Sequence, residues 1–330
     1  MKYLFYGTPD FARTALHALL EAGFPPLAVV TAPDRPSGRG LKLLPSPVKE
    51  LALQHHLPVL QPEKLKAPDF LAEIQGYRPD FQLVVAFRML PREVWGMPVG
   101  GTWNLHASLL PDLRGAAPIH WALRLGYSRT GLTVFRINEQ IDTGDCLAWS
   151  EVVIDPSWDA GMLHEVMAER GGALLVDAAM KISEGAYTLI PQGNEALRLK
   201  QANHPAPKIH KEDGLLDWTM TGHNLTHFVR AFAPRPGAFT WMEGQRLTLL
   251  KANRIAATDP LIPELTYLGA KAHRLYGPGT WTMLSGRWAV KALDEWIEIN
   301  EVKLQNSRTM SVPDFLRGYR GPTDSVFGNS

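Results

Sequence analysis

The chain has 330 residues, of which 45% are hydrophobic and 20% charged. This length and composition are typical of a globular protein of about two domains with a sizeable core, and they exclude an intrinsically disordered chain. The formal net charge of +1 excludes a global attraction to nucleic acid, although bases outnumber acids from His204 onward and acids outnumber bases before it.

The first half alternates predicted strands with predicted helices. Lys2–Tyr6 is predicted to be a strand, and Asp10 is predicted to cap a helix over Phe11–Glu21 that Gly23 would end. Apolar runs predict further strands, and helical spacing predicts further helices. The predicted strands are Leu27–Thr31, Phe81–Phe87, Thr102–Leu105 and Leu132–Ile137, and the predicted helices are Val48–His56, Phe70–Gln75 and Gly161–Ser183.

This alternation predicts an α/β fold, a Rossmann-like and mainly parallel sheet with flanking helices. Ligands of such sheets bind at the carboxyl ends of the strands. We therefore expect the polar motifs that follow the strands to line a site.

The second half begins after the polar, proline-containing stretch Gln201–Lys208, which is typical of a linker. We predict a first domain over residues 1–203, a linker at 204–210 and a second domain over 211–330. A helix at His223–Phe232 precedes short alternating runs, which predict a small β-barrel with OB-like topology. The runs are Ala238–Met242, Leu247–Lys251, Trp281–Met283, Trp288–Lys291 and Trp296–Val302.

The chain has one cysteine, Cys146, so neither an internal disulfide nor a cysteine-based metal site is expected. The amino terminus lacks the pattern of a signal peptide, and no apolar run approaches the roughly 18 residues that span a bilayer. We expect a cytoplasmic protein with no membrane partner.

Asn104 and His106 belong to the densest group of polar residues in the first domain. They lie two positions apart at the end of a predicted strand. The period of a strand places both side chains on one face. An amide can donate to an oxyanion and an imidazole can move a proton near neutral pH, which suits acyl transfer. The alternative is a buried histidine capped by an asparagine.

Asp142 lies in a turn after the predicted strand Leu132–Ile137. If that strand lies beside the Asn104 strand, the carboxylate can approach His106, orient the imidazole and stabilise its protonated form. An Asx turn is the alternative for Asp142, and Asp145 is a weaker candidate.

Other chemistries have less support. Ser108 lies too close to His106 for a nucleophile elbow, and G-x-S-x-G is absent. The sequence has neither H-E-x-x-H nor a glycine-rich phosphate-binding motif, so no metal and no nucleotide cofactor are expected. The segment Ala32–Pro47 is long for a strand–helix connection, and Arg35, Arg39 and Lys42 could contact phosphates unless it is simply a solvated loop.

At these residues the chain resembles the methionyl-tRNA formyltransferase family of folate-dependent formyltransferases. The resemblance lies in Gly7–Ala12, Pro33–Pro47, Asn104–Pro118 and Thr130–Asp145, and it continues through Leu215–Trp218 and Arg230–Phe232 into the second domain. The N-x-H-x-S-L-L-P motif with a later aspartate is shared with glycinamide ribonucleotide, sugar-nucleotide and hydrolase relatives. The PDRPSGRG loop and the attached barrel point to the tRNA-dependent branch.

The resemblance implies that 10-formyltetrahydrofolate is the co-substrate and the α-amine of methionyl initiator tRNA the acceptor, with no metal. Asn104, His106 and Asp142 match the catalytic residues of the family. The resemblance further implies folate contacts by Phe87, Met89, Ser108, Leu109, Leu110 and Pro111, and tRNA contacts by Arg35, Arg39, Lys42, Lys208 and Lys211. No obligate protein partner is implied, and a monomer is expected.

The chain departs from the family at Phe87-Arg88-Met89, where many members have Tyr-Gly, which bears on how folate is seated. Three alternatives remain at this stage. The first is a formyltransferase acting on an amino-sugar nucleotide, the second is a catalytically inactive RNA-binding relative, and the third is a nicotinamide oxidoreductase, which the missing glycine fingerprint disfavours.

Overall fold

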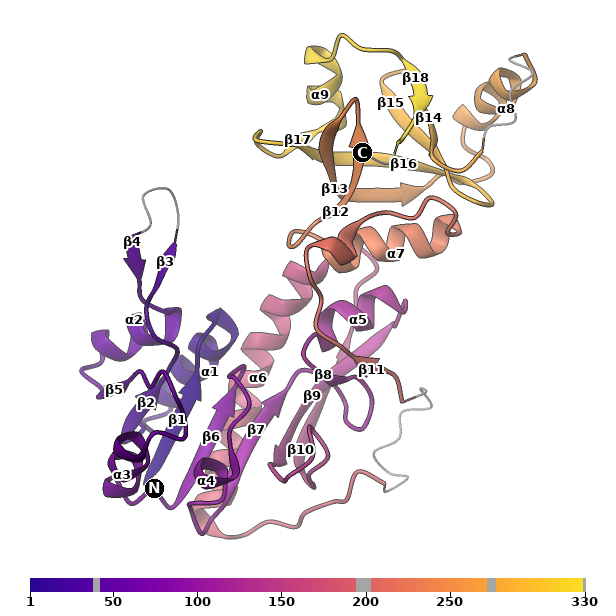
Figure 1. Cartoon of the computed structure of the whole chain (residues 1–330). Helices are drawn as coiled ribbons and strands as arrows, with labels where there is room; N and C mark the ends of the chain where they lie inside the picture. The colour runs from indigo at the N-terminus through magenta and orange to yellow at the C-terminus, as the bar shows by residue number, and fades with distance from the viewer. Residues whose placement is uncertain (38–41, 194–202, 272–276, 329–330) are drawn as a thin grey trace. The chain divides into compact units, whose positions relative to one another are not determined.

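The computed structural model of the protein describes residues 1–37, 42–193, 203–271 and 277–328, without the side chains of residues 37, 42 and 268–271 (Figure 1). Its contacts divide the chain into two compact units. The first unit contains Met1–Pro118, Arg129–Ile154 and Leu163–Pro207, and the second contains Ile119–Ser128, Asp155–Met162 and Lys208–Ser330. The predicted domain boundaries at residues 203 and 211 stay predictions.

The first unit is built on a mixed sheet with the strand order β10-β9-β7-β6-β1-β2-β5. The strands from β7 to β5 run parallel, and β9 and β10 add two antiparallel strands at one edge. The bounds are β1 Tyr3–Gly7, β2 Ala28–Val30, β5 Val59–Leu60, β6 Phe81–Val85, β7 Thr102–His106, β9 Arg129–Arg136 and β10 Cys146–Val153. The β1 and β6 strands are buried along their whole length, as expected for strands covered on both faces.

Helices cover both faces of this sheet. On one face, Phe70 and Ile74 from α3 and Val94 from α4 join the cluster that contains Leu4 and Tyr6 of β1. On the other face lie α1, α2 and α6, where Gly171 of α6 packs on Leu105 of β7. These helices are α1 Asp10–Glu21, α2 Pro47–Gln54, α3 Pro68–Gly76, α4 Arg92–Trp95 and α6 Ala160–Glu184, whereas α5 Pro118–Arg124 falls almost wholly in the second unit.

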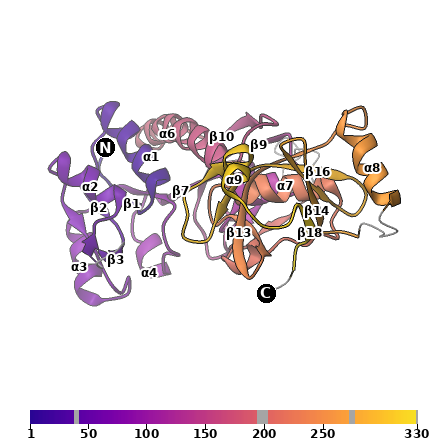
Figure 2. The ribbon, with the colours of Figure 1, turned by 90° about the horizontal axis from the view of Figure 1, so that it is seen from above.

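The α1 and α6 helices lie side by side (Figure 2). A Cβ added at Gly172 of α6 would lie 2.8 Å from the Cβ of Ala18 in α1, so the two helices approach closely only because this residue is glycine. The ring of Phe11 in α1 also contacts that of His164 in α6, with 5.3 Å between centroids. This packing covers the face of β7 that carries Leu105, and it leaves Asn104 and His106 on the opposite face.

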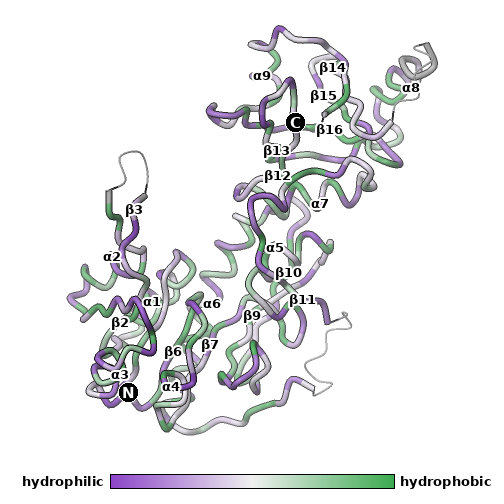
Figure 3. The backbone as a smooth tube through the Cα atoms, viewed as in Figure 1, coloured by the Kyte–Doolittle hydropathy of each residue, from purple (hydrophilic) through white to green (hydrophobic). Residues whose placement is uncertain are grey.

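Two small sheets complete the first unit. The strands β3 Arg35–Ser37 and β4 Lys42–Leu44 form an antiparallel hairpin, in which β4 is hydrophobic and β3 hydrophilic (Figure 3). Within the segment predicted to be a long loop, residues 35–37 and 42–44 therefore form two antiparallel strands, in which three consecutive residues of one strand pair with three of the other. The strands β8 Arg114–Gly115 and β11 Pro205–Ala206 pair in parallel, so part of the predicted linker is a strand in the first unit.

The second unit is an antiparallel sheet with the strand order β12-β13-β16-β15-β14-β18, with β17 paired to β16. A bridge between Trp241 of β12 and Gly328 joins the two ends of this order, so the sheet curls toward a barrel. The elements are η2 Glu212–Gly214, α7 Gly222–Phe232, β12 Ala238–Met242, β13 Gln245–Arg254, α8 Leu261–Lys271, β14 Thr280–Leu284, β15 Arg287–Lys291, β16 Trp296–Leu304, β17 Met310–Ser311, α9 Val312–Gly318 and β18 Asp324–Val326.

Aromatic side chains fill the interior of this sheet. The rings of Trp281 and Trp288 meet edge to face with 5.6 Å between centroids, and Trp288 stacks on Phe315 of α9 at 5.2 Å. Phe327 stacks on Trp218 at 5.0 Å. Such pairs contribute about 0.5–1.5 kcal/mol beyond their buried area, so they tie both ends of the second unit to one core.

The fold class predicted from the sequence is confirmed, and the predicted strand Ala238–Met242 coincides with β12. The prediction that Asp10 caps α1 is wrong, because Pro9 holds the N-cap position without a side-chain hydrogen bond and Asp10 is the first helical residue. Gly23 does follow the end of α1, with a φ of 78°. In the described part of the chain, every helix is too short or too polar to cross a membrane.

Candidate active site

His106 is the last residue of β7 and is buried, with 6% of its surface exposed. Its Nε2 lies 2.9 Å from the carbonyl oxygen of Leu113. Because a carbonyl can only accept a hydrogen bond, Nε2 carries a proton and donates it. The neutral imidazole therefore keeps its lone pair on Nδ1, which can accept a proton from a reacting group.

Asp142 faces the other ring nitrogen. Its Oδ2 lies 3.8 Å from Nδ1 of His106, and the same oxygen accepts a hydrogen bond of 2.9 Å from the backbone N–H of Gly115. The distance to Nδ1 is that of an ion pair with a protonated imidazole and is longer than a hydrogen bond. The predicted approach of the carboxylate to His106 is thus observed, and among the described residues the hydrogen bond to the Asp142 carboxylate comes from Gly115 and not from an Asx turn. In that loop Asn138 accepts from the N–H of Gln140 instead.

The approach depends on a loop that returns along the sheet. The strand β9 is antiparallel to β7, and its Thr133 pairs with His106. From Thr133, β9 continues for three more residues, about 10 Å, in the direction that leads away from His106. The loop then turns back, and a Cβ at Gly144 would collide with the carbonyl oxygen of Arg136. Asp142 itself has a φ of 53°, a left-handed conformation that a non-glycine residue adopts rarely.

Asn104 lies two residues before His106 on the same face of β7, paired with Val84 of β6 and Phe135 of β9. Its side chain is partly exposed, and it makes no hydrogen bond with another described residue. The side-chain amide can therefore donate both of its hydrogens to a ligand. A free amide donor beside an imidazole is the arrangement that a developing oxyanion needs.

The segment after His106 is buried and tightly bound. Ser108 donates to the carbonyl oxygen of Asp112 at 2.5 Å, and the hydroxyl of Thr133 donates to the carbonyl of Ser108 at 2.8 Å. The side chains of Ser108, Leu109 and Leu110 are at most 8% exposed, whereas Pro111 is partly exposed. The folate contacts of this stretch stay a prediction.

Phe87 and Met89 follow β6, the strand next to β7. The ring of Phe87 packs edge to face on Tyr6 with 5.7 Å between centroids, whereas Met89 is 73% exposed. Arg88 between them donates to the carbonyl oxygens of Pro62 and Glu63. Burial, and then the positive charge of Arg35, lower the pKa of the Arg88 guanidinium. Arg88 therefore ties the Phe87–Met89 segment to residues 62–63.

The structure describes the five predicted tRNA-binding residues to different extents. Arg35 in β3 is exposed, and so are Lys208 and Lys211 in the second unit. Arg39 lies outside the described residues, and only the backbone of Lys42 is described, as the first residue of β4. Their contacts with tRNA stay predictions.

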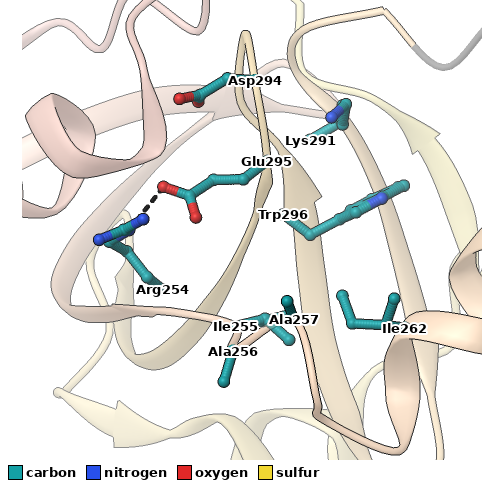
Figure 4. A pocket seen from close by; sticks show the side chains of 9 residues that line it. All are labelled: Arg254, Ile255, Ala256, Ala257, Ile262, Lys291, Asp294, Glu295 and Trp296. Carbon is teal, nitrogen blue, oxygen red and sulfur yellow. Dashed lines mark hydrogen bonds and ion pairs between the residues drawn. The ribbon is translucent and has the colours of Figure 1, made fainter.

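Two further observations concern ligands. Within the described residues, no group of three or more His, Cys, Asp or Glu side chains is arranged to hold a metal ion. A cavity of about 550 Å³ lies in the second unit, whereas the three candidate residues belong to the first (Figure 4). It is lined by Arg254, Ile255, Ala256, Ala257, Ile262, Lys291, Asp294, Glu295 and Trp296.

Sequence reasoning missed the groups that hold the candidate residues in place. Leu113 and Gly115 act through a backbone carbonyl and a backbone N–H, which any residue type supplies. The only signal was the position of Arg114-Gly115 shortly after the Asn-x-His motif. It gave no indication that these residues meet Asp142.

Comparison with known proteins identifies the family of the chain. Residues 1–179 match the family described as formyl transferase, and residues 208–320 match the formyl transferase C-terminal domain. Together the fold and these matches define a formyl transferase.

Relatives that match nearly the whole chain identify the family within this class. The methionyl-tRNA formyltransferase of Bacteroides fragilis is 37% identical over 97% of this chain and 95% of its own, and that of Acidobacterium capsulatum is 40% identical over 96% of each. The chain belongs to the methionyl-tRNA formyltransferase family and is an enzyme of one-carbon group transfer.

Solved structures support the fold. HypX from Aquifex aeolicus in complex with tetrahydrofolic acid has a TM-score of 0.61 at 18% identity, covering 96% of this chain and 47% of that one. The sugar 3N-formyl transferase WlaRD has a TM-score of 0.62 at 14% identity, covering 93% and 99%. At these identities the likeness concerns the fold alone.

Proposed function

We propose that the chain transfers the formyl group of 10-formyltetrahydrofolate to the α-amine of methionyl initiator tRNA, and so serves translation initiation in the cytoplasm. Support for the acceptor comes from relatives that share nearly the whole length of the chain and carry that name. The catalytic residues we propose are Asn104, His106 and Asp142. The proposal needs no metal, no second subunit and no obligate protein partner.

The reaction begins with attack of the neutral amine nitrogen on the formyl carbon, which places negative charge on the formyl oxygen. Asn104 stabilises this oxyanion, because its side-chain amide is free to donate and lies on the same face as His106. Removing one such donor typically raises the barrier by about 2.7–4 kcal/mol.

The proton must leave the attacking nitrogen and reach N10 of the folate before the carbon–N10 bond breaks. Nδ1 of His106 is the free ring nitrogen, since Nε2 donates to Leu113, so Nδ1 accepts this proton directly or through water. The imidazolium then faces Asp142 at 3.8 Å, which stabilises it until the proton is returned to N10. The products are the formylated aminoacyl-tRNA and tetrahydrofolate, with no covalent enzyme intermediate.

The residues present fit a folate co-substrate. Its pterin is flat, apolar on its faces and polar at its edge. The loops beside the site offer exposed apolar side chains, Met89 at 73% and Ile141 at 59%. Ala86, directly after β6, is an exposed residue with a φ of 46°, and we propose that its backbone polar groups meet the edge of the ring.

The observation that carries the proposal is the position of His106 between a carbonyl that fixes its tautomer and a carboxylate that can stabilise its charged form. The test is transfer of labelled formyl from the folate donor to methionyl initiator tRNA, with a charged elongator tRNA and an amino-sugar nucleotide as competing acceptors. Faster transfer to the sugar nucleotide, or none to any acceptor, would overturn the proposed substrate.

Asn104→Ala, His106→Ala and Asp142→Ala should each lower kcat by about 100- to 1000-fold. Each protein should keep its folded structure, since the three side chains are replaced by a smaller one without inserting bulk. Circular dichroism checks the fold and single-turnover transfer measures the rate. A variant with near-normal turnover removes that residue from the mechanism.

A further inference from the structure

Gln192 is a buried amide at the far side of the Asp142 loop, and its own surface is only 5% exposed. It lies beyond α6, where Ile190 pairs by two backbone hydrogen bonds with Cys146 at the start of β10. This pairing brings residues 190–192 alongside the loop that carries Asp142. A buried amide is stable only if its donors and its acceptor are all satisfied.

All of its polar groups are satisfied by the surroundings of the proposed catalytic carboxylate. Its Nε2 donates to the carbonyl oxygens of Asp142 at 2.9 Å and Gly144 at 2.7 Å. Its Oε1 accepts from Nε and Nη2 of Arg114 at 3.1 and 2.6 Å. The orientation of the amide follows from these partners, because carbonyls only accept and a guanidinium only donates.

These contacts reach Asp142 from two directions. On one side Gln192 holds the backbone of Asp142 and of Gly144. On the other it holds Arg114, whose neighbour Gly115 donates its N–H to Oδ2 of Asp142. The main chain and the carboxylate of Asp142 are thus fixed through one side chain, in a residue whose φ of 53° needs such support.

We propose that Gln192 is a positioning residue that acts through Asp142, holding its carboxylate opposite Nδ1 of His106. This inference rests on the proposed function of Asp142. Without the amide, the loop loses its two donors and the carboxylate loses its fixed distance from the imidazole. A displacement of about 1 Å in a reacting constellation can cost about 100-fold in rate.

The test is a double-mutant cycle with labelled formyl transfer measured under single-turnover conditions. Gln192→Leu should lower kcat about 10- to 100-fold while the KM values for the formyl donor and for methionyl-tRNA change less than about twofold. In the Asp142→Ala background the same substitution should lower the remaining rate less than about twofold, because a residue that acts through Asp142 has nothing left to position.

Two further variants keep the result interpretable. Gln192→Glu retains the shape of the side chain and an acceptor for Arg114 but loses both donors to the loop, so it should also lower kcat. Val152→Ala in β10 removes buried volume away from the loop and should leave kcat unchanged despite a lower melting temperature.

The outcomes separate the two proposals. A similar loss of rate from Gln192→Leu with and without Asp142, or full activity of either Gln192 variant beside an inactive Asp142→Ala, would overturn the positioning role alone. Full activity of Asp142→Ala would instead overturn the proposed role of Asp142. If Gln192→Leu does not fold, the Glu variant and its own cycle with Asp142→Ala decide the question.

Discussion

At the scale of single residues, the site is held by left-handed backbone at non-glycine positions. Ala86, Leu113 and Asp142 have φ values of 46°, 56° and 53°. Each such residue costs about 1–3 kcal/mol and persists only where the surroundings over-determine it. Leu113 supplies the carbonyl for His106, and Asp142 supplies the carboxylate, so both partners of the imidazole are groups in strained backbone.

Gly144→Ala should lower kcat about 10-fold or more and destabilise the first unit, because the new Cβ would collide with the carbonyl of Arg136 and push the Asp142 loop outward. Gly76→Ala at the end of α3 is the matched control, since a Cβ there meets no atom of the described residues within 4 Å. Single-turnover rates and thermal melts measure both effects. Unchanged turnover in Gly144→Ala would show that the return of the loop does not set the position of Asp142.

Arg35 is an exposed cation in β3 of the first unit, and we expect it to contact a phosphate of the tRNA. Arg35→Ala should raise the KM for methionyl-tRNA about 10-fold, leave kcat near normal and reduce the slope of log(kcat/KM) against log salt concentration by about one. Arg13→Ala, which removes an exposed arginine from α1, serves as the control. An unchanged salt slope in Arg35→Ala would contradict a phosphate contact.

At the scale of elements, the chain of contacts around His106 depends on pairings between segments far apart in sequence. The 3.8 Å approach needs β9 beside β7, and it needs β8 to pair with β11 across about 90 residues. In that second pairing the N–H of Leu113 donates to the carbonyl of His204 and the N–H of His204 donates to Asp112. The start of the predicted linker thereby holds the residue that fixes the histidine tautomer.

Two helices begin with a side chain that caps a backbone N–H, and each cap should contribute to stability. Ser46 caps α2 by accepting from the N–H of Lys49 at 3.1 Å, and Thr221 caps α7 by accepting from Asn224 at 3.2 Å. Ser46→Ala and Thr221→Ala should each lower the free energy of unfolding by about 1 kcal/mol. Urea titration measures both. A loss below about 0.3 kcal/mol in either variant would mean that its cap is satisfied in another way.

At the scale of the whole molecule, the two units differ in what holds them together. The first is a mixed sheet covered by helices, and the second is an antiparallel sheet closed around tryptophan and phenylalanine rings. The second also takes in Ile119–Ser128 and Asp155–Met162, where Arg230 of α7 donates to the carbonyl oxygens of Trp158 and Asp155. The boundaries between units in space therefore do not follow the order of the sequence.

The second unit should lose stability in mild acid through His227. Burial, and then the charges of His223, Arg230 and Arg254, lower the pKa of His227 from 6.5 to about 4. Between these values the unfolded chain binds a proton that the folded chain does not, so stability is retained above pH 6.5 and falls as the pH drops toward 4.

His227→Gln should reduce this pH dependence, whereas His17→Gln on the exposed side of α1 should leave it unchanged. The measurement is the urea midpoint of unfolding between pH 7 and pH 4 for the three proteins. Parallel curves for the wild-type chain and the His227 variant would contradict a lowered pKa at this residue.

The sequence by itself determined the types of most elements, since apolar periodicity reports which face of a segment is buried. The run Phe81–Val85 is apolar throughout because both faces of β6 are covered, and α1 buries the residues at helical spacing. It also placed Asn104 and His106 on one face, because the period of a strand is local geometry.

Only the tertiary structure decided how the site is assembled. The tautomer of His106 depends on the backbone carbonyl of Leu113, a group that every residue possesses. The positions of Asp142 and Gln192 depend on contacts between residues 27 to 78 positions apart and on a loop that folds back against its own strand. The local sequence pattern does not predict such contacts, because their free energy arises only when the sheet is complete.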